Sequence, residues 1–184
     1  MTIRRGDPET QRMALDLRTF ILDVPDFPKK GILFRDITPL LASAEALREA
    51  VRLLALPWVR QNIAAVAAAE ARGFMLGPAV ALELDAGFIP LRKPGKLPRK
   101  TRSASFALEY GEASLHVHET PFPKGKKILL LDDVLATGGT AEAMVKIVKE
   151  LDGVVAGFSF LIELGFLKGR ERLPGIQVES LLHY

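Results

Sequence analysis

The sequence predicts an α/β fold, in which helices cover both faces of a mostly parallel sheet. Short apolar segments with strand character alternate with segments of helical spacing, and no repeat or linker divides the 184 residues. The run from Lys127 to Leu131 is continuously apolar, as expected for a central parallel strand buried on both faces. The length fits a single domain with a substantial core.

The N-terminal part predicts two helices separated by a break. Apolar residues between Glu9 and Leu22 fall largely on one side of a helix. The segment from Asp26 to Gly31 is rich in Pro and Gly and interrupts regular structure. A second helix is expected from Ser43, a suitable N-cap, to Pro57, where the missing N–H ends it.

The segment from Ile63 to Glu70 has two readings. Its alanines favour a helix, whereas its short length and the following Arg72-Gly73 turn favour a buried strand. We weigh strand over helix at about two to one. A helix should follow to about Leu84, and then a strand from Phe88 to Arg92.

The remaining elements follow in order. Ala104 to Leu108 and Ser114 to Val117 are expected to form a hairpin. The helix after residue 140 carries an apolar stripe, and Gly153 can end it. Val154 to Ile162 and Gln177 to Leu182 have the composition of further strands, which completes the predicted α/β pattern.

Bulk composition excludes several classes of protein. Hydrophobic residues make up 48% and charged residues 26%, ordinary values for a globular protein. The absence of cysteine excludes disulfides, thiolate zinc sites and a cysteine nucleophile. No apolar run approaches the roughly 20 residues needed to span a bilayer. No apolar signal core follows the first residues, so we expect a cytoplasmic protein without a membrane partner.

Charge and histidine patterns are less specific. Six basic residues and no acid lie between Arg92 and Arg102. This run is either a solvated basic loop or an anion site; we expect no nucleic-acid partner, because stacking aromatics are missing from it. The three histidines, His116, His118 and His183, do not form a persuasive metal site.

The segment after the central apolar run carries the clearest chemical signal. Asp132-Asp133 follows the strand, and the loop from Ala136 to Thr140 enters the next helix. Glycines let the backbone approach an anion closely, the helix N-terminus favours negative charge, and threonine hydroxyls add donors. This combination predicts a cradle for a monophosphate. A simple tight turn is the alternative, at about one in ten.

The two carboxylates need a partner other than the phosphate, which would repel them. About one sugar length away, they can accept hydrogen bonds from vicinal hydroxyls or hold Mg²⁺ through water. A diol site beside a phosphate cradle matches ribose 5-phosphate. The Walker A and Rossmann glycine patterns are both missing from the sequence.

These residues resemble a known family. Ile128 to Thr140 is similar to the signature of the type I phosphoribosyltransferases, which bind 5-phosphoribosyl-1-pyrophosphate (PRPP). Further segments resemble the adenine phosphoribosyltransferases within that family: Phe27–Pro39, Ala71–Phe74, Arg92–Pro98, Leu108–Gly111 and Leu167–Leu173. The resemblance implies the type I fold in a single domain, 1–184. A small N-terminal hood (about 1–40) would cover the base site of the core (about 41–184), whose mobile loop lies near 97–113.

The family reaction joins adenine to PRPP and releases AMP and pyrophosphate, with Mg²⁺ as cofactor. By resemblance, Glu109 accepts the adenine N9 proton and Tyr110 closes over the site. The other expected contacts are listed by ligand. The 5-phosphate and ribose would meet Asp132, Asp133, Ala136, Thr137, Gly138, Gly139 and Thr140. The two aspartates would also support the metal, indirectly through water and PRPP. Pyrophosphate would meet Arg72, Arg92 and Lys96. Adenine would meet Leu33, Phe34, Arg35 and Leu164.

The resemblance leaves alternatives open. Ala71 stands where a hydroxyl residue is expected, Phe106 replaces a usual tyrosine, and the residues after Leu41 lack a frequent Asp-Pro. The base could be xanthine or hypoxanthine, because backbone presentation around Leu33 and Arg35 decides that choice. A non-catalytic PRPP-binding regulator is a further reading, although the first roughly 25 residues are too short for a winged helix. The resemblance also implies a homodimer.

Overall fold

The computed structural model describes residues 15–70, 72–107, 112–120 and 122–184. The chain divides into two compact units, Met1–Glu49 and Ala50–Tyr184. Among the described residues, no helix is long and apolar enough to cross a membrane.

The first unit contains a short 3-10 helix (Leu17–Phe20), a two-stranded antiparallel sheet and the helix α1 (Thr38–Ala42). The sheet pairs β1 (Leu22–Pro25) with β2 (Leu33–Asp36). Where residues 15–22 are described, the predicted α-helix is wrong. The Asp16 side chain accepts a hydrogen bond from the Arg18 N–H and closes a tighter turn instead. The predicted break between Asp26 and Gly31 is confirmed.

The helix α2 (Ala44–Ala55) runs across the boundary between the units. Ser43 accepts a hydrogen bond from the Ala46 N–H at 3.3 Å, which confirms its predicted capping role. The helix gives way to a short 3-10 turn (Leu56–Trp58) at the predicted proline, Pro57.

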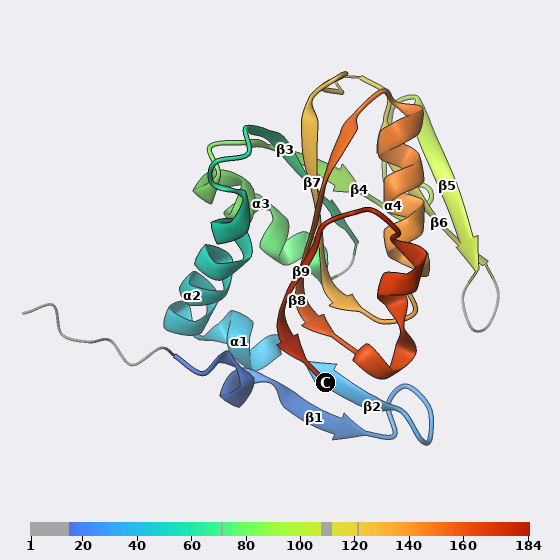
Figure 1. The fold of residues 1–184 in the computed structure, drawn as a ribbon. Coiled ribbons are helices and arrows are strands. Elements are labelled where there is room, and N and C mark those ends of the chain that lie inside the picture. Colours follow the sequence, from blue (N-terminus) through green and yellow to red (C-terminus); the bar gives the residue numbers. More distant parts are fainter. Residues whose placement is uncertain (1–14, 71, 108–111, 121) are drawn as a thin grey trace, which may run out of the picture. The chain divides into compact units, whose positions relative to one another are not determined.

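The second unit is built on a five-stranded parallel sheet in the order β4-β3-β7-β8-β9 (Figure 1). The strands are β3 (Ile63–Ala69), β4 (Gly87–Leu91), β7 (Lys127–Leu135), β8 (Val154–Glu163) and β9 (Val178–His183). The predicted central strand is confirmed, because β7 is the middle strand and its residues from Ile128 to Leu131 are fully buried.

Helices cover both faces of this sheet. The helix α3 (Gly73–Glu83) packs against β3 and β7, and α4 (Gly139–Glu150) lies on the other face (Figure 1). The antiparallel hairpin of β5 (Thr101–Ala107) and β6 (Glu112–His118) packs against α4. Two 3-10 turns, Gly165–Leu167 and Gly169–Arg172, connect β8 to β9.

The alanine-rich segment is a strand, so tertiary packing has overridden the helix propensity of alanine. Its small side chains let α3 approach the sheet closely. A methyl group at Gly77 of α3 would lie 2.8 Å from the Ala68 Cβ and 2.4 Å from the Phe88 ring. Larger residues in the strand would hold the helix away.

A buried polar chain joins the start of the second unit to β8. The Trp58 side chain is fully buried, and its Nε1 donates to the Ser159 Oγ at 2.7 Å. That hydroxyl donates in turn to the Leu54 carbonyl at 2.8 Å. Both groups are therefore satisfied in the interior. This chain of hydrogen bonds holds the C-terminal end of α2 against β8.

Candidate functional site

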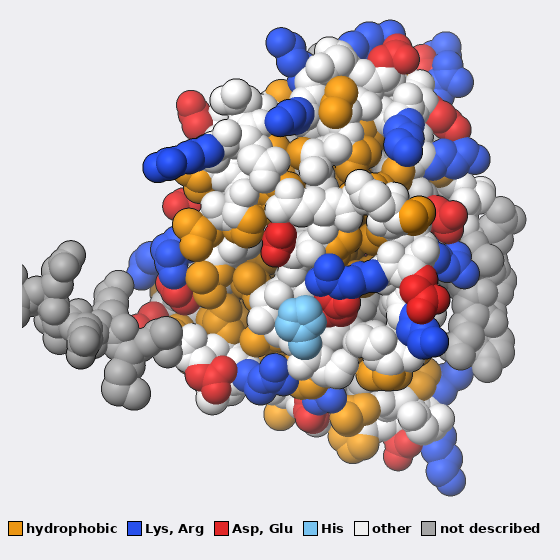
Figure 2. Space-filling view, viewed as in Figure 1, with side chains coloured by type: hydrophobic (Ala, Val, Ile, Leu, Met, Phe, Trp, Pro, Cys, Tyr) orange, Lys and Arg blue, Asp and Glu red, His pale blue; other side chains and the backbone are white. Residues whose placement is uncertain are grey.

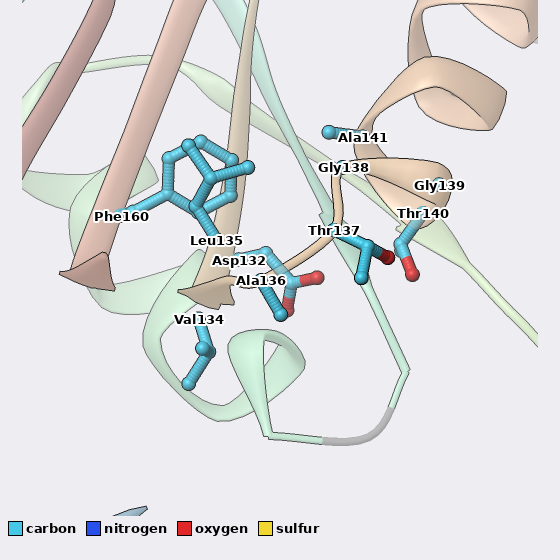
Figure 3. A pocket seen from close by; sticks show the side chains of 10 residues that line it. All are labelled: Asp132, Val134, Leu135, Ala136, Thr137, Gly138, Gly139, Thr140, Ala141 and Phe160. Carbon is cyan, nitrogen blue, oxygen red and sulfur yellow. The ribbon is translucent and has the colours of Figure 1, made fainter. Parts of the chain in front are cut away.

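A hollow lies at the carboxyl end of β7, where it passes into α4 (Figure 3). Ligands of α/β proteins bind at this edge of the sheet, because the strand-to-helix loops gather there. The hollow is lined by Asp132, Val134, Leu135, Ala136, Thr137, Gly138, Gly139, Thr140, Ala141 and Phe160. It therefore includes all five predicted phosphate-loop residues and one of the two predicted carboxylates.

The loop from Ala136 to Gly138 presents the N-terminus of α4 to this hollow. Gly138 adopts a left-handed conformation, with φ of 84°, immediately before the helix, and no side chain caps the helix. Thr137 and Thr140, which both carry a hydroxyl group, line the hollow (Figure 3). Free helix N–H groups, the helix dipole and two hydroxyls form a site for an anion such as a monophosphate.

The two aspartates lie within β7 rather than after it, and they face different partners. Asp132 points into the hollow (Figure 3). Asp133 is only 6% exposed, and its Oδ2 lies 2.8 Å from the Arg72 Nε. That oxygen accepts no hydrogen bond from the described residues, so the contact with Arg72 is ionic. Successive side chains of a strand point to opposite faces, which explains the division.

Burial and mutual repulsion shape the protonation of this pair. Burial, reinforced by the Asp133 charge, raises the pKa of Asp132 well above its ordinary value of 3.8. Burial also raises the pKa of Asp133, although the Arg72 guanidinium opposes the shift. A carboxylate whose surroundings stabilise its negative charge less well than water is stabilised when it meets a cation or a hydroxyl donor. The pair is thus prepared for a sugar hydroxyl or a hydrated cation.

The predicted pyrophosphate residues Arg72 and Arg92 follow two adjacent parallel strands, β3 and β4. Arg92 donates from Nε to Glu70 at 3.1 Å, and its guanidinium lies 5.6 Å from the centre of the Phe74 ring. Glu70 also accepts from the Lys93 N–H at 3.1 Å. The Arg92 hydrogen bond, with help from the Lys93 N–H, lowers the pKa of Glu70.

Lys96 and the rest of the basic run are largely exposed. Several of these cations pair with acids from elsewhere in the chain: Glu119 lies 3.2 Å from Lys100 and 3.0 Å from Arg102. On the face shown in Figure 2, basic and acidic side chains are interspersed in the same way. The run therefore has local structural partners that its own sequence did not reveal.

The predicted adenine residues lie in both units. Leu33, Phe34 and Arg35 are on β2, where the Phe34 ring meets Phe27 edge to face and Arg35 forms an ion pair with Asp23. Leu164 follows β8, and its N–H donates to the carbonyl of Leu135, a residue that lines the hollow, at 2.9 Å. Leu164 is thus close to the phosphate loop, and the joint base site remains a prediction.

Some predicted residues give no structural test. Ala71, Glu109 and Tyr110 lie outside the described residues. Phe106 is described, and it packs against the hydrophobic core. The His116 ring nitrogens lie 3.4 Å from the Thr101 Oγ1 and 3.2 Å from the Ser114 Oγ. Over the described ranges, no three His, Asp or Glu residues gather as a metal site would require.

Sequence reasoning missed the residues that hold this edge in place. A methyl group at Gly73 would lie 2.6 Å from the Asp132 Cα, so only glycine lets α3 start so close to the acid pair. Glu70 pairs with Arg92, and Glu163 at the end of β8 pairs with Arg170. An acid that ends an otherwise apolar strand is the sequence signal that could have identified both glutamates.

Comparison with known proteins agrees with this geometry. The family model of the phosphoribosyl transferase domain matches residues 40–165. The chain is 54% identical over 171 residues to the adenine phosphoribosyltransferase of Thermotoga maritima, covering 92% of this chain and 98% of that protein.

Solved structures show the same likeness. The adenine phosphoribosyltransferase of Thermoanaerobacter pseudethanolicus has a TM-score of 0.88 and 45% identity, covering 91% of this chain and 98% of that one. The Saccharomyces cerevisiae enzyme, in complex with an imino-altritol bisphosphate and adenine, has a TM-score of 0.82 and 32% identity, over 90% and 95% of the two chains. With a type I phosphoribosyltransferase fold and a matching family model, the chain belongs to the adenine phosphoribosyltransferases, a family of enzymes that transfer a phosphoribosyl group.

Proposed function

We propose that this protein transfers the 5-phosphoribosyl group of PRPP to adenine, giving AMP and pyrophosphate in purine salvage. One observation carries the proposal: the hollow that joins Asp132 to the N-terminus of α4 through the loop from Ala136 to Gly138. Its anion site and its carboxylate are suited to the phosphate and the hydroxyls of one ribose 5-phosphate. The yeast relative is described in complex with adenine and a sugar-like bisphosphate, which supports the same pair of substrates.

The reaction breaks the bond between C1 of the ribose and the pyrophosphate oxygen, and forms a bond from C1 to N9 of adenine. The N9 proton goes to a base, and the electron pair of the broken bond leaves with pyrophosphate. Since positive charge develops on the ribose, the protein mainly positions groups and balances charge. Thr137, Gly139 and Thr140 would hold the phosphate, and Asp132 the diol.

Arg72 and Glu109 complete the proposed site. Arg72, beside Asp133, lies at the sheet edge where the leaving pyrophosphate would depart. Arg92 donates to Glu70 through Nε and Nη2, so its remaining N–H groups would be the ones to meet pyrophosphate. Glu109 is the proposed proton acceptor. A carboxylate is a weak base, so the charged leaving group must assist the transfer.

Mg²⁺ is the proposed cofactor. Asp132 faces the hollow, and its carboxylate would support the ion through water and PRPP, whereas Asp133 is paired with Arg72 and would act through the same network. Water and PRPP would supply the direct ligands of the metal, and the bound ion would offset the charge of the pyrophosphate. We further propose a homodimer, as the family resemblance implies, and a cytoplasmic location.

Two other readings were open at the level of sequence. Turnover of xanthine or hypoxanthine would need a hydrogen-bond donor of the protein at the position where adenine needs an acceptor. The relative with 54% identity is an adenine phosphoribosyltransferase. A non-catalytic regulator would not need a base for proton transfer. Both alternatives are less well supported than the adenine reaction.

A direct assay tests the proposal. The purified protein is incubated with PRPP, Mg²⁺ and each purine base in turn, and pyrophosphate release is followed. We expect turnover with adenine that a chelator abolishes and added Mg²⁺ restores. Turnover with xanthine or hypoxanthine but not with adenine would contradict the substrate, and undiminished turnover in chelator would contradict the cofactor.

A further inference from the structure

The phosphate loop is in direct contact with a turn that lies about thirty residues later in the chain. We call the segment Lys168–Arg172, which contains the second 3-10 turn after β8, the brace. A methyl group on Gly138 would lie 2.6 Å from the Gly169 carbonyl oxygen. A methyl group on Gly169 would lie 2.3 Å from the Ala136 carbonyl oxygen and 2.8 Å from the Leu135 Cδ1. Each backbone therefore occupies the space where the other would place a side chain.

The brace is itself held by an ion pair between a buried carboxylate and a partly exposed guanidinium. Arg170 donates from Nε and Nη2 to the two oxygens of Glu163, at 2.6 and 2.7 Å, and from Nη1 to the Val178 carbonyl at 2.9 Å. Glu163 is the last residue of β8 and is 7% exposed. A bidentate pair with a planar guanidinium fixes orientation as well as distance. The brace is thereby tied to both β8 and β9.

Two further contacts attach the brace to the rest of the unit. Leu173, directly after it, is 3% exposed and belongs to the hydrophobic core. Arg172 donates to Glu142, in the first turn of α4, at 3.2 Å. The same short segment therefore touches the phosphate loop, the start of α4 and the end of β8.

We propose that Gly169 and the Glu163–Arg170 pair are positioning residues for the 5-phosphate: they hold the loop from Ala136 to Gly138 in its binding conformation. This inference rests on the proposed function for the identity of the anion. None of the three residues needs to touch the substrate. Their effect passes through the backbone contact between Gly169 and Ala136, and a loop displaced by about 1 Å loses much of its aligned binding energy.

The test measures binding of ribose 5-phosphate by calorimetry, since this probe needs no base, and the KM values of PRPP and adenine. Gly169→Ala should raise the Kd of ribose 5-phosphate and the KM of PRPP by about 10-fold or more, with the KM of adenine nearly unchanged. Arg170→Lys keeps the positive charge but cannot form the bidentate contact with Glu163. It should raise the Kd of ribose 5-phosphate and the KM of PRPP by a smaller factor.

Two control variants separate positioning from general loss of stability. Gly165→Ala places its methyl group no closer than 3.5 Å to other atoms, in the same connection between β8 and β9. Ser159→Ala removes the buried partner of Trp58, at a site with no described contact to the brace. Both should bind ribose 5-phosphate within about twofold of the wild type, while Ser159→Ala lowers the melting temperature.

The outcomes are separable. Binding within about twofold of the wild type in Gly169→Ala would overturn the inference, as would an equal loss of affinity in Ser159→Ala. If Arg170→Lys does not fold, Gly169→Ala still decides, because it replaces neither Glu163 nor Arg170. A wild type that binds ribose 5-phosphate but does not use adenine would refute the proposed function alone. Normal adenine turnover with normal binding in Gly169→Ala would refute this inference alone.

Discussion

At the level of single residues, the acid pair shows how neighbouring identical side chains acquire different environments. Asp132 and Asp133 are equivalent in the sequence pattern, and both were expected to hold the ribose. In the structure only Asp132 lines the hollow, whereas Asp133 is buried against Arg72. The burial that prepares Asp132 to meet a ligand also makes its ionised form unfavourable in the free protein.

Asp132→Asn should therefore stabilise the free protein while it weakens binding. The folded-state pKa of Asp132 is raised, so the stability tied to this group is complete below its unfolded pKa near 3.8 and is lost as pH rises through the folded value. At pH 8 the wild type carries this cost, and the asparagine variant does not. We expect its melting temperature to be at least about 2 °C higher.

The matched control is Asp152→Asn, since that aspartate is 71% exposed and pairs with Lys124 at the surface. Its melting temperature should stay close to that of the wild type. Calorimetry should show weaker binding of ribose 5-phosphate by Asp132→Asn only. A melting temperature at pH 8 equal to or below that of the wild type would contradict the assignment of the cost to Asp132.

At the level of elements, the site depends on how closely helices approach the sheet. The start of α3 lies against β7 because Gly73 has no side chain, and α4 begins where Gly138 turns the chain with positive φ. The small alanine side chains of β3 likewise let Gly77 of α3 come close to the sheet. Small residues at these points bring the charged ends of β3, β4 and β7 to one edge.

Gly73→Ala should disturb both the packing of α3 and the acid pair. Its methyl group would lie 2.6 Å from the Asp132 Cα and 3.0 Å from the Asp133 N, and backbone atoms cannot move aside cheaply. We expect a loss of about 1–3 kcal/mol in the free energy of unfolding, as for other overpacked sites. Urea denaturation measures it, and ribose 5-phosphate affinity should fall as well.

Gly87→Ala is the control. Gly87 is the first residue of β4, and its methyl group would come no closer than 3.5 Å to any other atom, the Ala64 carbonyl oxygen. Its free energy of unfolding should stay within about 1 kcal/mol of the wild type. Equal effects of the two substitutions would show that the close contact at Gly73 has no special cost.

At the level of the whole molecule, ion pairs at strand ends connect distant parts of the second unit. Glu70 with Arg92 joins β3 to the segment after β4, and Glu163 with Arg170 joins β8 to the brace. The Arg170 hydrogen bonds lower the pKa of Glu163, against the opposing effect of burial. The acid pair and these glutamates therefore respond to pH in opposite directions.

The melting temperature should fall toward both ends of the pH range. Glu70 and Glu163 have lowered folded-state pKa values, so their contribution is present above the unfolded value of about 4.5 and is lost as pH falls through the folded values. Thermal denaturation from pH 3 to pH 8 follows this loss. Glu163→Gln should melt lower at neutral pH but show a shallower decline in acid; an unchanged acid slope would contradict the role of Glu163.

Much of the architecture could be predicted because periodicity and turn residues act locally. The strand from Ile63, the helix after Ser43 and the phosphate loop all lie where the sequence placed them. The helix expected up to Leu22 is wrong over the described residues, because a local hydrogen bond to Asp16 competes with helical spacing. The length of β7 was underestimated, since charged residues normally end a strand and here they remain paired within the sheet.

The sequence by itself determined the fold class, the central strand and the loop that presents a helix N-terminus to an anion, because these depend on residues adjacent in the chain. Only the tertiary structure decided which aspartate faces the hollow, that Glu70 pairs with Arg92, and that Gly169 packs against the backbone of Ala136 in the loop. The physical reason is that burial, ion pairing and close backbone contact arise between segments far apart in the chain. Their separation in the sequence does not show that they are close in space.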